Sequence, residues 1–195
     1  MYSTRFRNAF TYAASLHEKQ TRKGTSVPYI THLRAVAALV GEAGGSEDEA
    51  IAALLHDAVE DQGGAPILQA IEERFGKTVA DIVQSCSDTE VTPKPPWRER
   101  KEAYLEHLET ATASALLVSC ADKLHNARAV VSDLRLIGDR LWSRFNASKD
   151  ESLWYYRALA EVFRRRAAPE MLVGELERTV QDMIRLANDA QTKPD

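Results

Sequence analysis

Hydrophobic residues recur along much of this chain with the period of an amphipathic helix. Ile30, Leu33, Val36, Ala37 and Val40 form one apolar stripe, because residues three and four apart share a helix face. Comparable stripes recur toward the end of the chain. Together they predict helices over residues 3–20, 28–43, 47–61, 66–75, 77–87, 97–110, 113–132, 134–144, 150–166 and 170–189. The pattern therefore indicates a chain built almost entirely of helices.

Helix starts are marked by capping residues, and helix breakers are few. Ser46 with Glu49, and Ser148 with Glu151, have the spacing of a capping box, which satisfies backbone N–H groups at a helix start. The 9 glycines and 7 prolines concentrate between the predicted helices. The proline-rich loop PKPPW (93–97) is either a simple connector or a rim over a site.

The segment ALLVSCAD (115–122) has two interpretations. It resembles a buried parallel strand that ends in an acidic residue, and it also fits an apolar stretch within a helix. A doubly wound sheet needs several such strands, and neither a convincing second strand nor a glycine-rich phosphate-binding loop occurs. The helix is therefore preferred, and the expected fold class is all-α.

Composition and charge exclude several classes of protein. A length of 195 residues predicts one domain over 1–195, and the balance of 25 basic and 29 acidic side chains argues against a nucleic-acid partner. No apolar run approaches the roughly 20 residues that cross a bilayer, so no membrane partner or signal peptide is expected. Cys86 and Cys120 lack metal or redox spacing, which favours free thiols and a cytoplasmic location. The sequence leaves the oligomeric state open.

The densest group of reactive side chains lies in LLHDAVEDQGG (54–64). His56 and Asp57 are adjacent on the predicted helix, and Glu60 and Asp61 follow one turn later. Acidic residues at a helix C-terminus oppose the helix dipole, and they repel one another unless a cation or water compensates. The segment is therefore either part of a metal site or a solvated acidic helix end.

Two further segments carry side chains of the kind that bind metals. His32 lies in the first two turns of a predicted helix, on the flank of its apolar stripe, where a lone histidine is usually structural. Asp122 follows an apolar run, where a salt bridge would also explain it. Together with His56 and Asp57, they form a set of two imidazoles and two carboxylates that suits Mn²⁺, Fe²⁺, Co²⁺ or Zn²⁺. Such an ion turns water into a hydrolytic nucleophile, and the following acidic pair would be available for proton transfer.

The order of these motifs, H…HD…D, resembles that of the HD-domain metal-dependent phosphohydrolases. More narrowly, the chain resembles the hydrolase domain of RelA/SpoT-type alarmone enzymes and their stand-alone small relatives. The matching stretches are TRKGTSVPYITH (21–32), LLHDAVED (54–61), FGKTVADIV (75–83), ERKEAYLEHL (99–108) and ADKLHNAR (121–128). The resemblance implies a compact all-α bundle of about ten helices, with a motif core over 5–130 and C-terminal helices over 134–189 packed on it.

The resemblance also implies an activity and a division of roles. The reaction would release pyrophosphate from the 3′ position of (p)ppGpp, leaving GDP or GTP, with one divalent ion, most commonly Mn²⁺. The implied metal ligands are His32, His56, Asp57 and Asp122, and the implied catalytic pair is Glu60 and Asp61. The residues implied to contact the nucleotide are Arg22, Lys23, Asn126, Arg128 and Tyr156. Lys123 joins them as a further cation, because a substrate rich in phosphate needs local positive charge on an acidic protein.

Several assignments stay open at this point. The same residues would serve a phosphohydrolase of another nucleotide, such as NADPH or a deoxynucleotide, or a non-catalytic module that senses a nucleotide. Gln62 departs from the threonine found in many relatives. His125 is expected to point about 100° away along its helix, and His17 and His107 are expected to be exposed. The three tryptophans are expected to anchor the core or loops, and Asn126 would serve equally well as a partner of Asp122.

Overall fold

The computed structural model describes residues 2–87 and 95–189, and within those ranges it is helical, with no strand. The elements in chain order are α1 (Thr4–Leu16), α2 (Ile30–Glu42), α3 (Glu47–Leu55), α4 (Ala58–Gln62), α5 (Ala65–Phe75), α6 (Lys77–Cys86), α7 (Trp97–Leu108), α8 (Ala113–Ile137), the 3₁₀ helix η1 (Gly138–Arg144), α9 (Lys149–Arg165) and α10 (Glu170–Asp189). The all-α prediction is confirmed. The first part of the PKPPW loop lies outside the described residues.

Local sequence signals explain most helix boundaries. Both predicted capping boxes are formed, at the starts of α3 and α9. The segment 115–122 lies within α8, as the helical interpretation predicted. The prediction of two helices over 113–132 and 134–144 is wrong, because nothing between those ranges breaks the helix. Gly138 ends it instead, with a positive φ of 57° that favours glycine, and η1 follows.

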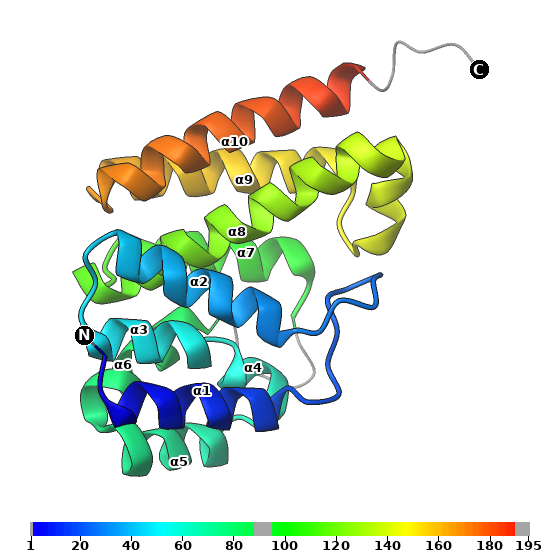
Figure 1. Ribbon diagram of the computed structural model, residues 1–195. Coiled ribbons are helices and arrows are strands. Elements are labelled where there is room, and N and C mark those ends of the chain that lie inside the picture. The colour runs from blue at the N-terminus through cyan, green and yellow to red at the C-terminus, as the bar shows by residue number, and fades with distance from the viewer. Residues whose placement is uncertain (1, 88–94, 190–195) are drawn as a thin grey trace.

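The long helix α8 lies at the centre of the fold. It packs against α2, α3 and α6 on one side and against α9 and α10 on the other. Figure 1 shows α8, α9 and α10 grouped together, with α2 between them and the group formed by α1, α3, α5 and α6. One contiguous hydrophobic cluster extends from α1 to α10 and includes the fully buried Leu33, Leu54, Leu124 and Phe163. No helix in the described ranges is both long and apolar enough to span a bilayer.

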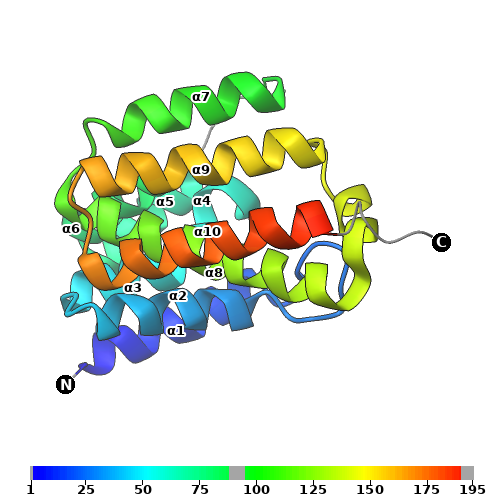
Figure 2. The same ribbon diagram turned by 90° about the horizontal axis from the view of Figure 1, so that it is seen from above.

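Two loops meet at one end of the molecule. The connection between α1 and α2 and the segment from η1 to α9 lie side by side there (Figures 1 and 2). The side chain of Lys23 reaches Asn146, and Arg144 packs over Gly24. A β-bridge between Thr21 and Pro28 closes the base of the first loop. These loops therefore border the end of the bundle at which the reactive side chains converge.

Candidate active site

Four side chains from three packed helical segments converge on one point. His32 lies on α2, His56 and Asp57 join α3 to α4, and Asp122 lies on α8. His56 Nε2 is 3.0 Å from Asp57 Oδ2 and 3.5 Å from Asp122 Oδ1. His32 Nε2 is 3.1 Å from Asp122 Oδ1 and 3.6 Å from Asp57 Oδ2. The structure thus brings together all four predicted ligands, called here the His–Asp cluster. The Nε2 atom of each imidazole faces both carboxylates.

The helix is interrupted at the adjacent pair His56–Asp57, although both residues keep backbone angles of the right-handed helical region. The prediction of one helix over 47–61 is wrong, since α3 ends at Leu55 and α4 begins at Ala58. On a continuous helix, consecutive side chains diverge by about 100°. At the break, Asp57 has φ −94° and ψ −3°, and both side chains face the same centre. The interruption of the helix therefore coincides with the two residues that belong to the cluster.

The free ring nitrogens of the two histidines fit a divalent cation. The Nε2 atoms of His32 and His56 are buried, and carboxylate oxygens lie 3.1 and 3.0 Å from them without the geometry of a hydrogen bond. His56 Nδ1 lies 2.8 Å from the carbonyl oxygen of Ala53, to which it donates its hydrogen, so Nε2 of the neutral ring carries a lone pair. Buried polar atoms without partners are rare in proteins. A metal ion between these nitrogens and the two carboxylates accounts for them.

His125 contacts one of the candidate ligands, so the expectation that it points away is wrong. Its Nδ1 lies 2.8 Å from Nδ1 of His32. His125 follows Asp122 by three residues on α8, and residues at that spacing share a helix face. Burial, together with the neighbouring His32 and Arg22, lowers the pKa of His125 to about 4, so this ring is neutral and accepts the hydrogen of His32 Nδ1. That bond leaves His32 Nε2 available as a ligand atom.

The two carboxylates of the cluster are oriented by further hydrogen bonds. Asn126 Nδ2 donates to Asp122 Oδ1 at 2.6 Å, and Lys123 Nζ donates to Asp122 Oδ2 at 2.6 Å. Burial opposes ionisation of Asp122, but Lys123 and the histidines hold its pKa well below the usual range. The hydroxyl of Tyr29 donates to Asp57 Oδ2 at 2.7 Å. Tyr29 was not among the site residues predicted from the sequence. The only feature that pointed to it was its position one turn before His32.

The acidic pair that follows the cluster is divided between two sides of α4. Glu60 lines the same cavity as Asp57. Asp61 accepts a hydrogen bond of 2.8 Å from Gln20 Nε2 and lines a separate hollow with Leu16 and Gln62. Partial desolvation and the charge of Asp57 raise the pKa of Asp61 above that of an ordinary aspartate. Only Glu60 of the pair therefore faces the cavity beside the cluster.

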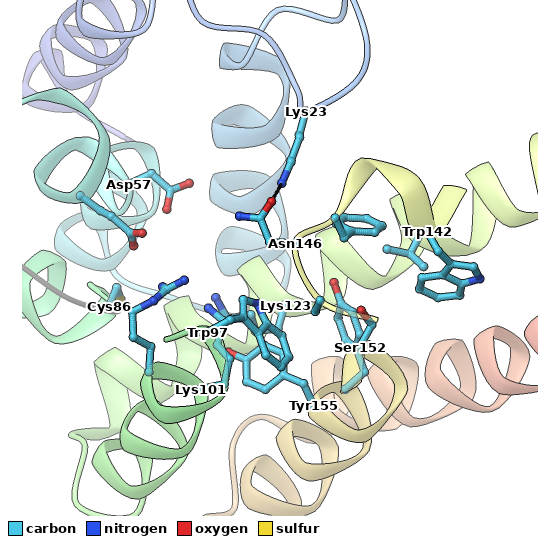
Figure 3. A pocket seen from close by; sticks show the side chains of 16 residues that line it. Lys23, Asp57, Cys86, Trp97, Lys101, Lys123, Trp142, Asn146, Ser152 and Tyr155 are labelled. Carbon is cyan, nitrogen blue, oxygen red and sulfur yellow. Dashed lines mark hydrogen bonds between the residues drawn. The ribbon is translucent and has the colours of Figure 1, made fainter. Parts of the chain in front are cut away.

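Beside the cluster lies a cavity of about 390 Å³, called here the inner cavity. Asp57 and Glu60 are among its lining residues, and Figure 3 shows Asp57 at one end of it. Its cationic lining residues are Lys23, Arg100, Lys101 and Lys123, and its aromatic ones are Trp97, Trp142, Phe145, Tyr155 and Tyr156. Arg100 and Lys101 were not assigned from sequence, although they lie in the ERKEAYLEHL stretch that carries part of the resemblance. The inner cavity is positively charged although the chain has a net charge of −4.

A second cavity of about 490 Å³, the loop cavity, adjoins the first. Lys23, Val130, Phe145 and Tyr156 line both. Arg22 lies in the loop cavity, where it donates a hydrogen bond of 2.7 Å to Asn126 Oδ1 and covers the ring of Tyr29.

Among the residues predicted to bind substrate, Arg128 is placed elsewhere. It forms an ion pair of 3.5 Å with Glu175 and lines neither the inner nor the loop cavity. Six residues along α8 turn its side chain about 240° from Asp122, which directs it toward α10.

His17 was expected to be exposed and is buried, with 2% of its surface accessible. His107 is exposed as expected, and its ring lies 2.9 Å from the hydroxyl of Ser85.

Comparison with known proteins places this geometry in a family. A family model described as HD domain matches residues 9–150. The guanosine-3′,5′-bis(diphosphate) 3′-pyrophosphohydrolase MESH1 of Xenopus tropicalis is 35% identical over 178 residues, which cover 89% of this chain and 92% of that protein. The bifunctional (p)ppGpp synthase/hydrolase SpoT of Escherichia coli K12 is 36% identical over 134 residues, which are 66% of this chain and 18% of SpoT.

A solved structure has the same fold. It is that of a metazoan ortholog of SpoT that hydrolyses ppGpp, and it superposes with a TM-score of 0.77 at 26% identity over 93% of this chain and 96% of that one. The family match covers well over half of the chain and includes all four converging side chains. The chain therefore belongs to the HD-domain family and is a metal-dependent hydrolase of that family.

Proposed function

We propose that this chain is a Mn²⁺-dependent 3′-pyrophosphohydrolase of (p)ppGpp, which releases pyrophosphate and leaves GDP or GTP. One observation carries the proposal: Asp57 of the His–Asp cluster lines a cavity whose wall holds four cations on an acidic protein. Such a wall suits a nucleotide that carries several phosphate groups. The names of the MESH1 and SpoT relatives support the same substrate.

The proposed metal ligands are His32, His56, Asp57 and Asp122, a mixed set of imidazole and carboxylate donors that suits Mn²⁺. A divalent ion supplies Lewis acidity, which lowers the pKa of water toward neutrality and polarises phosphoryl oxygens. Lys123 is bound to Asp122, so its role is to orient that ligand and to contribute positive charge at the cavity floor.

The acidic pair is proposed to manage the proton of the attacking water. Glu60 lines the inner cavity beside Asp57, where a carboxylate would orient a water molecule and accept its proton. Asp61 lies one residue further along α4, in the separate hollow rather than in the inner cavity, and its pKa is raised by the charge of Asp57 among other causes. Its proposed part is therefore to relay the proton, and not to contact the attacking water.

The remaining cavity residues are proposed to bind the nucleotide. Lys23, Arg100 and Lys101 would neutralise phosphate charge along the inner cavity. Arg22, Asn126 and Tyr156 border the loop cavity, which would hold the nucleoside. Binding then replaces contacts made within the protein, such as the bond from Arg22 to Asn126, by contacts to substrate.

The decisive experiment is chromatographic product analysis with purified protein, Mn²⁺ and a nucleotide panel. We expect ppGpp to yield GDP and pyrophosphate, and EDTA to abolish the reaction. Glu60→Gln should keep the metal and lose turnover, whereas the exposed Glu102→Gln should match the parent protein. Intact ppGpp in the presence of Mn²⁺ would contradict the proposal, and binding without turnover would instead identify a nucleotide-sensing module.

A second candidate, a phosphohydrolase of NADPH or a deoxynucleotide, is favoured by the adjoining cavities. Because Lys23 and Tyr156 line both, their combined space suits a dinucleotide as well as a guanosine nucleotide. The product distinguishes the two candidates. Release of inorganic phosphate from NADPH, with ppGpp left untouched, would establish the second candidate.

The protein is also assigned to the cytoplasm. Cys86 and Cys120 are both buried free thiols, which suits a reducing compartment. Cell fractionation followed by immunoblotting tests the assignment, and recovery in an exported or membrane fraction would contradict it.

A further inference from the structure

The side chain of Gln20 is the centre of a polar network between α1 and α4. Its Nε2 donates to Asp61 Oδ2 at 2.8 Å. Its Oε1 lies 2.6 Å from Gln62 Nε2 and 2.6 Å from His17 Nδ1. The sequence motifs predicted no role for Gln20, and the proposed reaction does not involve Gln20, His17 or Gln62.

This arrangement determines which end of the Gln20 amide faces Asp61. The oxygen Oε1 accepts hydrogens from both His17 and Gln62, so the donor Nε2 must face the carboxylate. The backbone of Gln20 is bound as well, because its N–H donates to His17 and its carbonyl accepts from Tyr29. Gln20 therefore presents its amide to Asp61 from a fixed position.

His17 links the same network to the His–Asp cluster. It is buried, with 2% of its surface accessible, and its ring stacks on Tyr29 at 5.3 Å between centroids. Tyr29 in turn donates its hydroxyl hydrogen to Asp57. The segment from His17 to Gln20 thus supports one acidic residue through an amide and another through a stacked tyrosine.

We propose that Gln20 is a positioning residue that orients Asp61 for the reaction, with His17 and Gln62 fixing the Gln20 amide. Gln20 holds Oδ2 of Asp61, and Oδ1 has no hydrogen bond to any residue in the described ranges. Asp61 is therefore held through one of its two carboxylate oxygens. This inference rests on the proposed function, because it assigns Gln20 to the proton-transfer step through Asp61.

The test combines Gln20→Met, Asp61→Asn and the double variant. Methionine keeps the length of glutamine and removes both hydrogen-bonding groups. We expect Gln20→Met to lower kcat for pyrophosphate release about 10- to 100-fold, with an unchanged KM and an unchanged affinity for Mn²⁺. In the Asp61→Asn background the same change should have no further effect, because the residue it positions is already lost. Glu18→Met, at an exposed neighbouring position outside that hollow, is the matched control and should behave like the parent protein.

A kcat at the parent level in Gln20→Met, or an equal loss in the Asp61→Asn background, would overturn the proposal. A second measurement separates this outcome from failure of the proposed function. If no nucleotide on the panel is hydrolysed, the proposed function fails, yet thermal unfolding still reports on the pair. Each single variant should lower Tm by about 2–4 °C, with the double variant no lower than either; additive losses would show that Gln20 and Asp61 are not coupled.

Discussion

The His–Asp cluster lies on three packed helical segments, whereas the basic residues Arg22 and Lys23 lie on the loop between α1 and α2 (Figure 1). In the cluster, His32, His56 and Asp122 are almost completely buried, at 0%, 3% and 5% exposure. In the loop, Arg22 is held by one hydrogen bond to Asn126, and Lys23 by one of 3.4 Å to Asn146.

The difference shows how one site combines two requirements. A metal ligand must be in place before substrate arrives, so its partners are backbone and buried side chains that solvent does not replace. A substrate-binding cation must release its partner when a phosphate enters, so a neutral amide partner is suitable. Changes in the cluster should therefore affect chemistry and metal content, and changes in the loop should affect substrate affinity.

The largest expected effect is that of Asp57→Asn, which removes a carboxylate from the cluster and leaves its shape. Loss of metal-based stabilisation worth several kcal/mol should lower kcat about 10³-fold or more. The measurement is pyrophosphate release together with metal content by mass spectrometry. Asp81→Asn removes an exposed helix carboxylate and is the control. An active Asp57→Asn protein with a full complement of metal would show that the cluster does not require this ligand.

The next effect concerns metal removal and its dependence on pH. Burial opposes protonation of His56, but Asp57 and Asp122 outweigh it and raise its pKa well above the usual value in the metal-free protein. The stability contributed by this proton is present at pH values below the usual histidine pKa and is lost as pH rises through the raised one.

Mn²⁺ binding requires that His56 lose this proton, so Mn²⁺ binds more tightly as the pH rises. The stabilisation by Mn²⁺ should therefore grow from about pH 6 to about pH 8. At one constant Mn²⁺ concentration, chosen in hundredfold excess over the Kd at pH 8, the gain in Tm should reach about 5–10 °C at that pH. Differential scanning fluorimetry with EDTA or Mn²⁺ across this range is the measurement. A gain that is constant or falls with pH would contradict the assignment of His56 as a ligand.

A smaller effect is expected from Lys23→Ala and Arg22→Ala in the loop. Each should raise KM for ppGpp about tenfold, equivalent to about 1.4 kcal/mol, because one charge-assisted contact is lost, while kcat and metal content stay unchanged. Arg128→Ala removes the same charge from a residue paired with Glu175 outside both cavities, and it should leave KM unchanged. Steady-state kinetics are the measurement. A KM that is raised in Arg128→Ala, and in neither of the other two variants, would support Arg128 as a substrate-binding residue and contradict its exclusion on structural grounds.

The smallest effect should come from the loop backbone. Gly24 has φ +71°, and an added Cβ would lie 2.6 Å from Arg144 Cδ, whereas Gly44 has φ +81° and its added Cβ would meet no described atom within 4 Å. Alanine at either position should cost about 1–2 kcal/mol of unfolding free energy. Only Gly24→Ala should also raise KM, since it displaces Arg144 beside the loop. Denaturant unfolding and steady-state kinetics of the two variants are the measurements. Equal KM values would show that the packing of Arg144 over Gly24 does not position Lys23.

Much of the fold and the chemistry of the site were predictable from local patterns. Apolar periodicity located the helices, and the capping boxes at Ser46 and Ser148 marked two helix starts. The residue types of the cluster indicated a metal before any geometry was known. Tyr29 and Arg100 were missed because a tyrosine just before a helix, or an arginine within one, carries no local signal of function. Their importance arises from neighbours that are remote in sequence, Asp57 for Tyr29 and the inner cavity for Arg100.

By itself, the sequence determined a helical protein with two imidazoles and two carboxylates suited to one divalent ion, because periodicity and residue chemistry are local properties. Only the tertiary structure decided which side chains meet. His56 and Asp57 meet His32 and Asp122 where α3, α2 and α8 pack together, and packing against α2 also brings His125 to His32. The turn of α8 carries Arg128 away. These outcomes depend on how helices distant in sequence pack against α8, and packing of that kind is a property of the whole fold.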